Sequence, residues 1–256
     1  AMYCRHCFRK RLVGQSDEEI AKAFDAIFDY ITDHKEITNI LISGGDSLLN
    51  SNNILEYYLK KLTSVPHLKL IRFGTRTPVV LPSRIYEDSE LLNILKKYSS
   101  IKPIYFVTQF NHPRELTEEA KKAVDSLTDN GIVVSNQTVL LKGINDNPEV
   151  MIELINRLNQ LKIIPYYIFQ CRPVSGVKSQ FQVPIKRGYR IIEEAKAHLN
   201  GHGKRFRFIM SHESGKIEII GTLPSGETIF KYHQAKNPAD NGSIFIRNID
   251  DNQCWL

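Results

Sequence analysis

The segment Thr38-Asn39-Ile40-Leu41-Ile42-Ser43-Gly44-Gly45-Asp46 leads from a short apolar run directly into a turn that contains two glycines. The run predicts a strand over residues 38–43, and glycine allows the close backbone approaches that a strand-to-helix turn needs. Asp46 can then cap the next helix, because an N-cap aspartate accepts hydrogen bonds from backbone N–H groups. The turn is therefore either purely structural or part of a binding site at the end of the strand.

Apolar runs and amphipathic stretches alternate beyond this segment. Mostly apolar strands that alternate with helices favour a parallel sheet covered by helices. A spacing of roughly 30 residues per unit is typical of βαβ units that close into a full or partial barrel. An open doubly wound sheet is the competing topology. The predicted strands are 38–43, 68–73, 104–108, 132–141 and 164–169, and the predicted helices are 17–34, 53–62, 90–98, 115–129 and 148–161.

The C-terminal part of the chain has a different character. A predicted helix over 185–199 leads to a strand over 205–211, and further short β-rich segments are separated by turn residues. The sequence therefore predicts an antiparallel β appendage over residues 206–256, after a barrel part over residues 1–205. The short segments are 216–221, 228–232 and 243–247.

The composition is that of a globular protein. Apolar residues make up 42% and charged residues 24% of the 256 residues, which excludes a disordered or collagen-like chain. No apolar run reaches the roughly 20 residues of a membrane-spanning helix, so no membrane association is expected. The 34 Lys and Arg residues against 28 Asp and Glu residues give a net charge of +6, which allows anionic ligands. No aromatic-rich RNA motif accompanies the basic residues, so no nucleic-acid partner is expected.

The four cysteines are too few for a disulfide framework in a chain of this size, which favours a reducing cytoplasm. Cys4 and Cys7 form a C-x-x-C pair, whereas Cys171 and Cys254 stand alone. The pair fits half of a zinc site, a redox dithiol or part of an iron–sulfur site. No second ligand pair follows that would complete a zinc site, no preceding strand supports a thioredoxin-like dithiol, and an iron–sulfur cluster needs more thiolates.

The segment Met2-Tyr3-Cys4-Arg5-His6-Cys7-Phe8-Arg9-Lys10-Arg11 resembles the cluster loop of the lysine 2,3-aminomutase family of radical S-adenosylmethionine enzymes. The resemblance weakens after Cys171, and the final part of the chain does not follow the lysine enzyme. Further blocks that carry the resemblance are residues 41–49, 74–82, 110–113, 136–146 and 165–171.

The resemblance implies an α/β fold of the partial (βα)6 barrel type, from which this chain lacks the first strand. It implies a [4Fe–4S] cluster held by three thiolates, with one iron open for S-adenosylmethionine, which yields a 5′-deoxyadenosyl radical after electron transfer. Cys4 and Cys7 would be two of the ligands. Because the family spacing is C-x-x-x-C-x-x-C, we expect the third cysteine directly before Ala1, preceded by an apolar strand. An electron-donor protein is implied as a partner.

The resemblance also implies contacts to S-adenosylmethionine. Arg76 alternatively pairs with a surface carboxylate, and the amides on strand 132–141 alternatively satisfy local backbone groups. Gln109 stands where the lysine enzyme carries a histidine, and we expect His112 to be structural because it opens a turn. The implied cofactor-binding residues are Ser43, Gly44, Gly45, Asp46, Arg76 and Gln137.

Two residues are implied at the reacting amino acid. Arg9 matches the arginine that binds the substrate α-carboxylate, for which a planar guanidinium is suited. Lys216 matches the catalytic lysine that forms a Schiff base with pyridoxal phosphate, although the preceding turn has one glycine instead of several. Alternatively, Lys216 begins a β-hairpin and points to solvent.

Arg172 and Ser211 occupy the positions at which the lysine enzyme holds the distal ammonium of its substrate with aspartates. An arginine there would repel an ammonium and pair with a carboxylate. The substitution resembles the glutamate 2,3-aminomutase branch, and it predicts an acidic or neutral polar distal group on the substrate. Alternatively, Arg172 turns outward or binds a phosphate.

The sequence therefore predicts a cytoplasmic radical S-adenosylmethionine isomerase that acts on a small amino acid, and it leaves oligomer formation open. One alternative is a radical enzyme of another reaction type that uses no pyridoxal phosphate. A second alternative is a noncatalytic barrel domain that binds anions or nucleotides.

Overall fold

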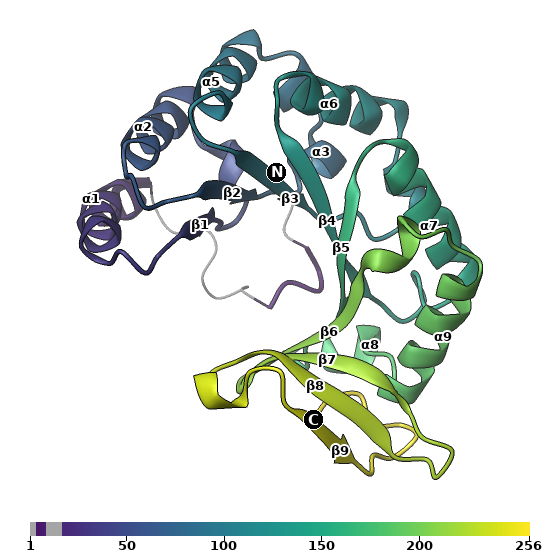
Figure 1. The fold of residues 1–256 in the computed structure, drawn as a ribbon. Coiled ribbons are helices and arrows are strands. Elements are labelled where there is room, and N and C mark those ends of the chain that lie inside the picture. Colours follow the sequence, from purple (N-terminus) through teal and green to yellow (C-terminus); the bar gives the residue numbers. More distant parts are fainter. Residues whose placement is uncertain (1–3, 9–16) are drawn as a thin grey trace. The chain divides into compact units, whose positions relative to one another are not determined.

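The computed structural model describes residues 4–8 and 17–256, which Figure 1 shows as a ribbon. Within this part of the chain, nine strands form one mixed sheet in which the strands follow their sequence order. The chain divides into two compact units, residues 1–109 with 116–135 and residues 110–115 with 136–256.

The first unit repeats a strand followed by helices, and its strands pair in parallel. Its strands are β1 (Asn39–Ile42), β2 (Leu70–Gly74) and β3 (Ile104–Thr108), followed by the first residues of β4 (Val133–Leu140). Its helices are α1 (Asp17–Asp33), the 3₁₀ helix η1 (Ser47–Leu49), α2 (Asn52–Thr63), α3 (Thr77–Val80), α4 (Ser83–Tyr86), α5 (Ser89–Ser99) and α6 (Glu118–Asp129).

The second unit continues with parallel strands and ends in an antiparallel segment. β5 pairs in parallel with β6, whereas β6, β7, β8 and β9 pair in antiparallel order. Its strands are the rest of β4, β5 (Ile164–Gln170), β6 (Arg207–His212), β7 (Gly215–Thr222), β8 (Thr228–Ala235) and β9 (Ile244–Arg247). Its helices are η2 (Pro113–Glu115), α7 (Pro148–Gln160), α8 (Lys178–Phe181), α9 (Ile185–Ala197), η3 (Gly203–Arg205) and η4 (Pro238–Asp240).

The helices α2, α5 and α6 begin at capping side chains and bury apolar residues. Ser51, Asp88 and Thr117 each accept a hydrogen bond from a backbone N–H in the first turn of α2, α5 and α6. In the second unit, Gly188 lets α9 approach the sheet closely, because a Cβ there would lie 2.9 Å from Cδ2 of Leu140.

The predicted α/β class is confirmed, and so is the antiparallel C-terminal segment. The Gly-Gly-Asp turn leads into the 3₁₀ helix η1 before α2 begins, and the short helices α3, α4 and α8 were not predicted. Closure into a partial barrel and the division at residue 205 stay predictions. No helix of the described residues is both long enough and apolar enough to cross a bilayer.

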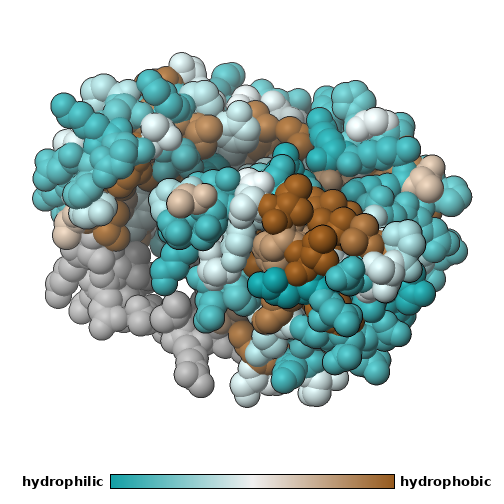
Figure 2. Space-filling model, turned by 60° about the horizontal axis from the view of Figure 1, so that its bottom comes forward, coloured by the Kyte–Doolittle hydropathy of each residue, from teal (hydrophilic) through white to brown (hydrophobic). Residues whose placement is uncertain are grey.

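The C-terminal strands carry apolar side chains at the surface. Ile244 is 65% exposed on β9, and Ile246 and Ile220 are exposed as well. Figure 2 shows that hydrophobic residues gather in one area of the surface, among hydrophilic neighbours. β9 is the last strand of the sheet, and its outer edge is unpaired among the described strands.

Candidate functional site

Asp46 fastens the turn after β1 to the turn after β2. Its Oδ1 caps η1 by accepting from the backbone N–H of Leu48 at 3.2 Å, and it also accepts from the hydroxyls of Thr75 at 2.5 Å and Thr77 at 3.0 Å. Its Oδ2 accepts from the backbone N–H of Arg76 at 2.6 Å. The helix-capping alternative for Asp46 is therefore correct, and its contact with a cofactor stays a prediction.

The glycine turn itself lies open at the surface. Ser43, Gly44 and Gly45 are all exposed. Among the described residues, no atom lies within 4 Å of the place that a Cβ on Gly44 would occupy, and the φ angle of Gly44 is not positive. The glycine therefore provides space beside the backbone at this turn, which is what the approach of a ligand requires.

Arg76 connects Cys4 with the residue that follows β3. Its Nη1 donates to Sγ of Cys4 at 3.4 Å, and its Nε donates to the backbone carbonyl of Gln109 at 3.1 Å. Sγ of Cys4 also lies 3.9 Å from Oε1 of Gln109. The guanidinium is therefore held next to the sulfur, and its charge complements that of a thiolate. Whether Arg76 contacts the cofactor stays a prediction.

Cys4 and Cys7 lie in one turn, closed by a 3.0 Å hydrogen bond from the N–H of Cys7 to the carbonyl of Cys4. Both thiols are half-buried, and neither forms a disulfide. No group of three or more His, Cys, Asp or Glu side chains that could hold a metal is found in the described part of the chain. The donor set therefore fits two of the three thiolate ligands of a [4Fe–4S] cluster.

The other two cysteines are in a different environment. Cys171 is buried, and burial raises the pKa of its thiol to about 11. Burial also raises the pKa of Cys254. Both shifts disfavour the thiolate form that metal binding requires.

Asn136 in the second unit satisfies local backbone groups, as the structural alternative for this strand predicted. Its Oδ1 accepts from the N–H of Phe110 at 2.6 Å, and its Nδ2 donates to the carbonyl of Phe110 at 3.0 Å. His112 is structural as expected, since its Nδ1 accepts from the N–H of Arg114. Gln137 is half-buried on β4, and its role in cofactor binding stays a prediction.

Arg172, Ser211 and Lys216 lie together in the second unit. Nε and Nη2 of Arg172 donate to the backbone carbonyl of Ser211 at 2.9 and 2.6 Å. Ser211 pairs directly with Lys216 across β6 and β7. Ser211 and Lys216 therefore lie at one end of the β6–β7 pair, and Arg172, which follows β5, is bonded to the same end. Arg9 lies outside the described residues.

The turn before Lys216 is held by hydrogen bonds and not by several glycines. The N–H and the hydroxyl of Ser214 both contact Nδ1 of His212, at 3.2 and 2.8 Å, and the hydroxyl of Tyr232 donates to Oγ of Ser214 at 3.1 Å. Gly215 has a φ of +137°. Lys216 does begin a hairpin strand, but it is half-buried and its ammonium lies over the ring of Tyr167.

No sequence motif indicated several of the residues that surround Arg76 and Lys216 in the structure. Thr75 and Thr77 lie in the block 74–82 that carries the family resemblance, but Arg76 is the residue of this block that is predicted to contact the cofactor. Tyr167, Arg207 and His233 form a hydrogen-bonded series on three different strands. Burial, with the nearby Arg207, lowers the pKa of His233.

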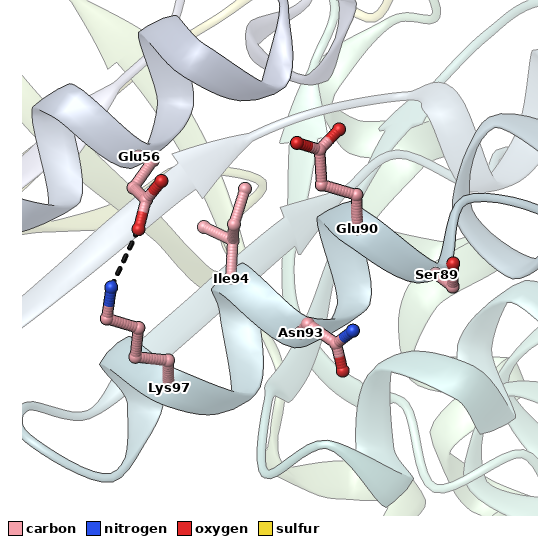
Figure 3. Close-up of a pocket in the computed structure, with 6 residues that line it drawn as sticks. All are labelled: Glu56, Ser89, Glu90, Asn93, Ile94 and Lys97. Atoms are coloured by element: carbon pink, nitrogen blue, oxygen red, sulfur yellow. Dashed lines mark hydrogen bonds and ion pairs between the residues drawn. The ribbon is translucent and has the colours of Figure 1, made fainter.

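A pocket of about 340 Å³ lies between α2 and α5, on residues of the first unit (Figure 3). Glu56 of α2 and Lys97 of α5 form an ion pair of 2.8 Å at one end of it. None of the predicted site residues lines this pocket. Its lining residues are Glu56, Ser89, Glu90, Asn93, Ile94 and Lys97.

Comparison with known proteins identifies related chains. The model of the Radical SAM superfamily matches residues 1–155. The chain is 40% identical, over all of its length, to a protein of Aquifex aeolicus named "Putative L-lysine 2,3-aminomutase". It is 45% identical to the L-lysine 2,3-aminomutase of Clostridium subterminale over 79% of this chain, and 42% identical to the glutamate 2,3-aminomutase of Clostridioides difficile over 78%. The chain spans 68%, 47% and 46% of the lengths of these three relatives.

Proposed function

The chain belongs to the Radical SAM superfamily and within it to the lysine 2,3-aminomutase family, and from this membership we propose that the protein is a radical S-adenosylmethionine enzyme that moves an amino group within an amino acid. The observation that carries the proposal is the guanidinium of Arg76, 3.4 Å from Sγ of Cys4. Asp46 fixes the backbone of this arginine from the turn after the neighbouring strand. The first unit thus brings together the cysteine pair, the glycine turn and the half-buried Asp46 that anchors Arg76.

The bound [4Fe–4S] cluster and S-adenosylmethionine would supply the radical that abstracts a substrate hydrogen. Cys4 and Cys7 would be two of the three thiolate ligands of the cluster. The hydrogen bond from Arg76 to Cys4 would make the cluster easier to reduce, because donors to ligand sulfurs stabilise the more negative state. An electron-donor protein is proposed as the partner that delivers the electron.

Lys216 would hold pyridoxal phosphate, which supplies a π-system that stabilises the migrating amino group. Support comes from the position of Lys216 at the end of the β6–β7 pair, opposite Ser211. Its turn is held by His212, Ser214 and Tyr232, which limits the positions that the lysine backbone can take. Arg9 would bind the substrate carboxylate.

The substrate would carry an acidic or neutral polar distal group. The guanidinium of Arg172 is anchored on the carbonyl of Ser211, so a fixed positive charge belongs to the strand pair that carries Lys216. A distal carboxylate can form charge-assisted hydrogen bonds with such a group, whereas an ammonium is repelled. Identities of 45% and 42% to the lysine and glutamate enzymes do not separate the two substrates, so Arg172 carries this part of the proposal.

The test uses the full-length protein, reconstituted anaerobically with iron and sulfide. We expect iron–sulfur absorbance, cleavage of S-adenosylmethionine to 5′-deoxyadenosine, and migration of an amino group when pyridoxal phosphate is added. The Cys4→Ala variant should lose the cluster, whereas Cys254→Ala should keep it, since Cys254 belongs to the other unit. Equal iron loading of both variants would overturn the proposal. A cluster without any effect of pyridoxal phosphate would instead indicate another radical reaction.

A further inference from the structure

The ammonium of Lys216 lies over the ring of Tyr167, with 5.3 Å between Nζ and the ring centroid. A cation within about 6 Å of an aromatic ring centroid is attracted by the negative face of the ring. Tyr167 lies on β5 opposite Arg207 of β6, and Lys216 lies on β7 opposite Ser211 of β6. The long side chain of Lys216 therefore reaches across β6 to the ring.

The hydroxyl of Tyr167 contacts His233, which in turn contacts Arg207. The hydroxyl lies 2.7 Å from Nε2 of His233, and Nη1 of Arg207 lies 2.6 Å from Nδ1 of the same imidazole. A guanidinium can only donate, so Nδ1 accepts, and the neutral imidazole carries its proton on Nε2. His233 therefore donates to the hydroxyl oxygen of Tyr167 and restricts the orientation of the ring.

The ring of Tyr167 is the contact that the structure shows for the ammonium of Lys216. Tyr167 is only 4% exposed, so its position is set by packing as well as by His233. Glu218, two residues after Lys216 on β7, lies 3.6 Å from Nη1 of Arg207. Among the described residues, Lys216 forms no ion pair with a carboxylate. Glu218 thus pairs with Arg207, and the ammonium of Lys216 contacts the ring of Tyr167.

We propose that Tyr167 is a positioning residue that holds the free Lys216 ammonium on its ring face and so controls how readily this amine reacts with a carbonyl compound. The inference rests on the proposed role of Lys216 in binding pyridoxal phosphate. An amine attacks a carbonyl carbon through its lone pair, so the ammonium must first release a proton. The contact with the ring must therefore be broken before the amine can reach the carbonyl carbon. Water is then lost as the imine forms.

The test measures the reactivity of Lys216 with formaldehyde and cyanoborohydride in the full-length protein at neutral pH. The rate of methylation at Lys216 is followed by mass spectrometry of its peptide. We expect Tyr167→Leu to raise this rate about two- to five-fold, as the usual strength of a cation–π contact implies. Tyr167→Phe should stay within about two-fold of the wild type, because it keeps the ring and loses only the hydroxyl.

Lys196 provides a matched control within the same protein, since its Nζ lies 5.4 Å from the ring centroid of Phe206. Tyr167→Leu should leave methylation of Lys196 unchanged, and Phe206→Leu should leave Lys216 unchanged. If Tyr167→Leu does not fold, Tyr167→Met serves as the ring-free variant. Equal rates at Lys216 in the wild type and the ring-free variant overturn the proposal, as does an equal increase in Tyr167→Phe.

The outcome is separate from that of the proposed function. Borohydride trapping with pyridoxal phosphate shows whether Lys216 binds the cofactor, whereas the rate of methylation by formaldehyde measures the reactivity of the amine without the cofactor. If pyridoxal phosphate fails to label Lys216 while the formaldehyde rates follow the prediction, the cofactor role is wrong and the contact with Tyr167 stands. If labelling succeeds but the rates do not depend on the ring, Tyr167 has no positioning role.

Discussion

The backbone N–H of Arg76 donates a 2.6 Å hydrogen bond to Oδ2 of Asp46, which joins the turns after two neighbouring strands. The side chain of the same arginine reaches Cys4 and the carbonyl of Gln109. One carboxylate therefore determines where the guanidinium stands relative to a cysteine that lies 72 residues earlier in the chain. This relationship gives Asp46 a clear role before any ligand binds.

We expect Asp46→Asn to lower the free energy of unfolding by about 1.5–3 kcal/mol, the usual contribution of hydrogen bonds to a charged group. Asparagine removes the charge and places an N–H₂ group where either Arg76 or the threonine hydroxyls now donate. Urea unfolding measures the effect. Asp129→Asn is the matched control, since Asp129 is exposed at the end of α6. If both variants unfold at the same urea concentration, Asp46 does not fasten the turns.

We expect Gly215→Ala to destabilise the protein by about 3 kcal/mol or more, from backbone strain together with overlap of atoms. Gly215 has a φ of +137°, and a Cβ there would lie 2.2 Å from the carbonyl oxygen of Gln234. Thermal or urea unfolding measures the loss. Gly201→Ala should be nearly neutral, because no described atom lies within 4 Å of its Cβ position. A small effect of both changes would contradict the tight hairpin before Lys216.

We expect Arg172→Asp to reverse the preference of the reconstituted full-length enzyme from glutamate to lysine. Turnover of glutamate should fall at least about ten-fold, since a like-charge contact costs several kcal/mol, and lysine should become the better substrate. Hydrogen abstraction from each amino acid measures the change. Arg187→Asp is the control, because Arg187 pairs with Asp146 on an exposed surface. Efficient turnover of lysine and none of glutamate by the wild type would exclude the acidic substrate.

We expect the stability of the second unit to fall on acidification through the titration of His233. Burial lowers the pKa of His233 below its ordinary value of 6.5, so the unfolded chain binds a proton more readily than the folded one. The contribution is therefore fully present above about pH 6.5 and is lost as the pH falls through the folded pKa. The groups that face the imidazole are Tyr167 of β5, Arg207 of β6, Lys216 and Glu218 of β7, and Lys231 of β8.

Urea unfolding at a series of pH values measures this dependence. His233→Gln should reduce the slope between pH 5 and pH 6.5, the range in which histidine titrates (about 6.5 when unperturbed). His198→Gln is the control, since His198 is exposed after α9. A slope that is the same in all three proteins would show that His233 does not titrate differently in the folded state.

The sequence by itself determined the α/β class and the alternation of strands and helices along the chain, whereas the order of the strands in the sheet came from the structure. Apolar strands followed by amphipathic helices leave few alternatives to a parallel sheet, and turn residues such as Asp240-Asn241-Gly242 marked the antiparallel end. The cysteine spacing and the blocks up to Cys171 determined the family. These features are local or periodic, so neighbouring residues along the chain contain all the information that they require.

Only the tertiary structure decided which side chains meet. Cys4, Asp46, Arg76 and Gln109 come from four separate turns, and their contacts depend on strands that pair in parallel with a particular register. The contact of Lys216 with Tyr167 likewise depends on β7 pairing with β6, because a shift by one residue would turn Lys216 to the other face of the sheet. No residue spacing in the sequence predicts this register, so the contact between Lys216 and Tyr167 could be found only from the paired strands.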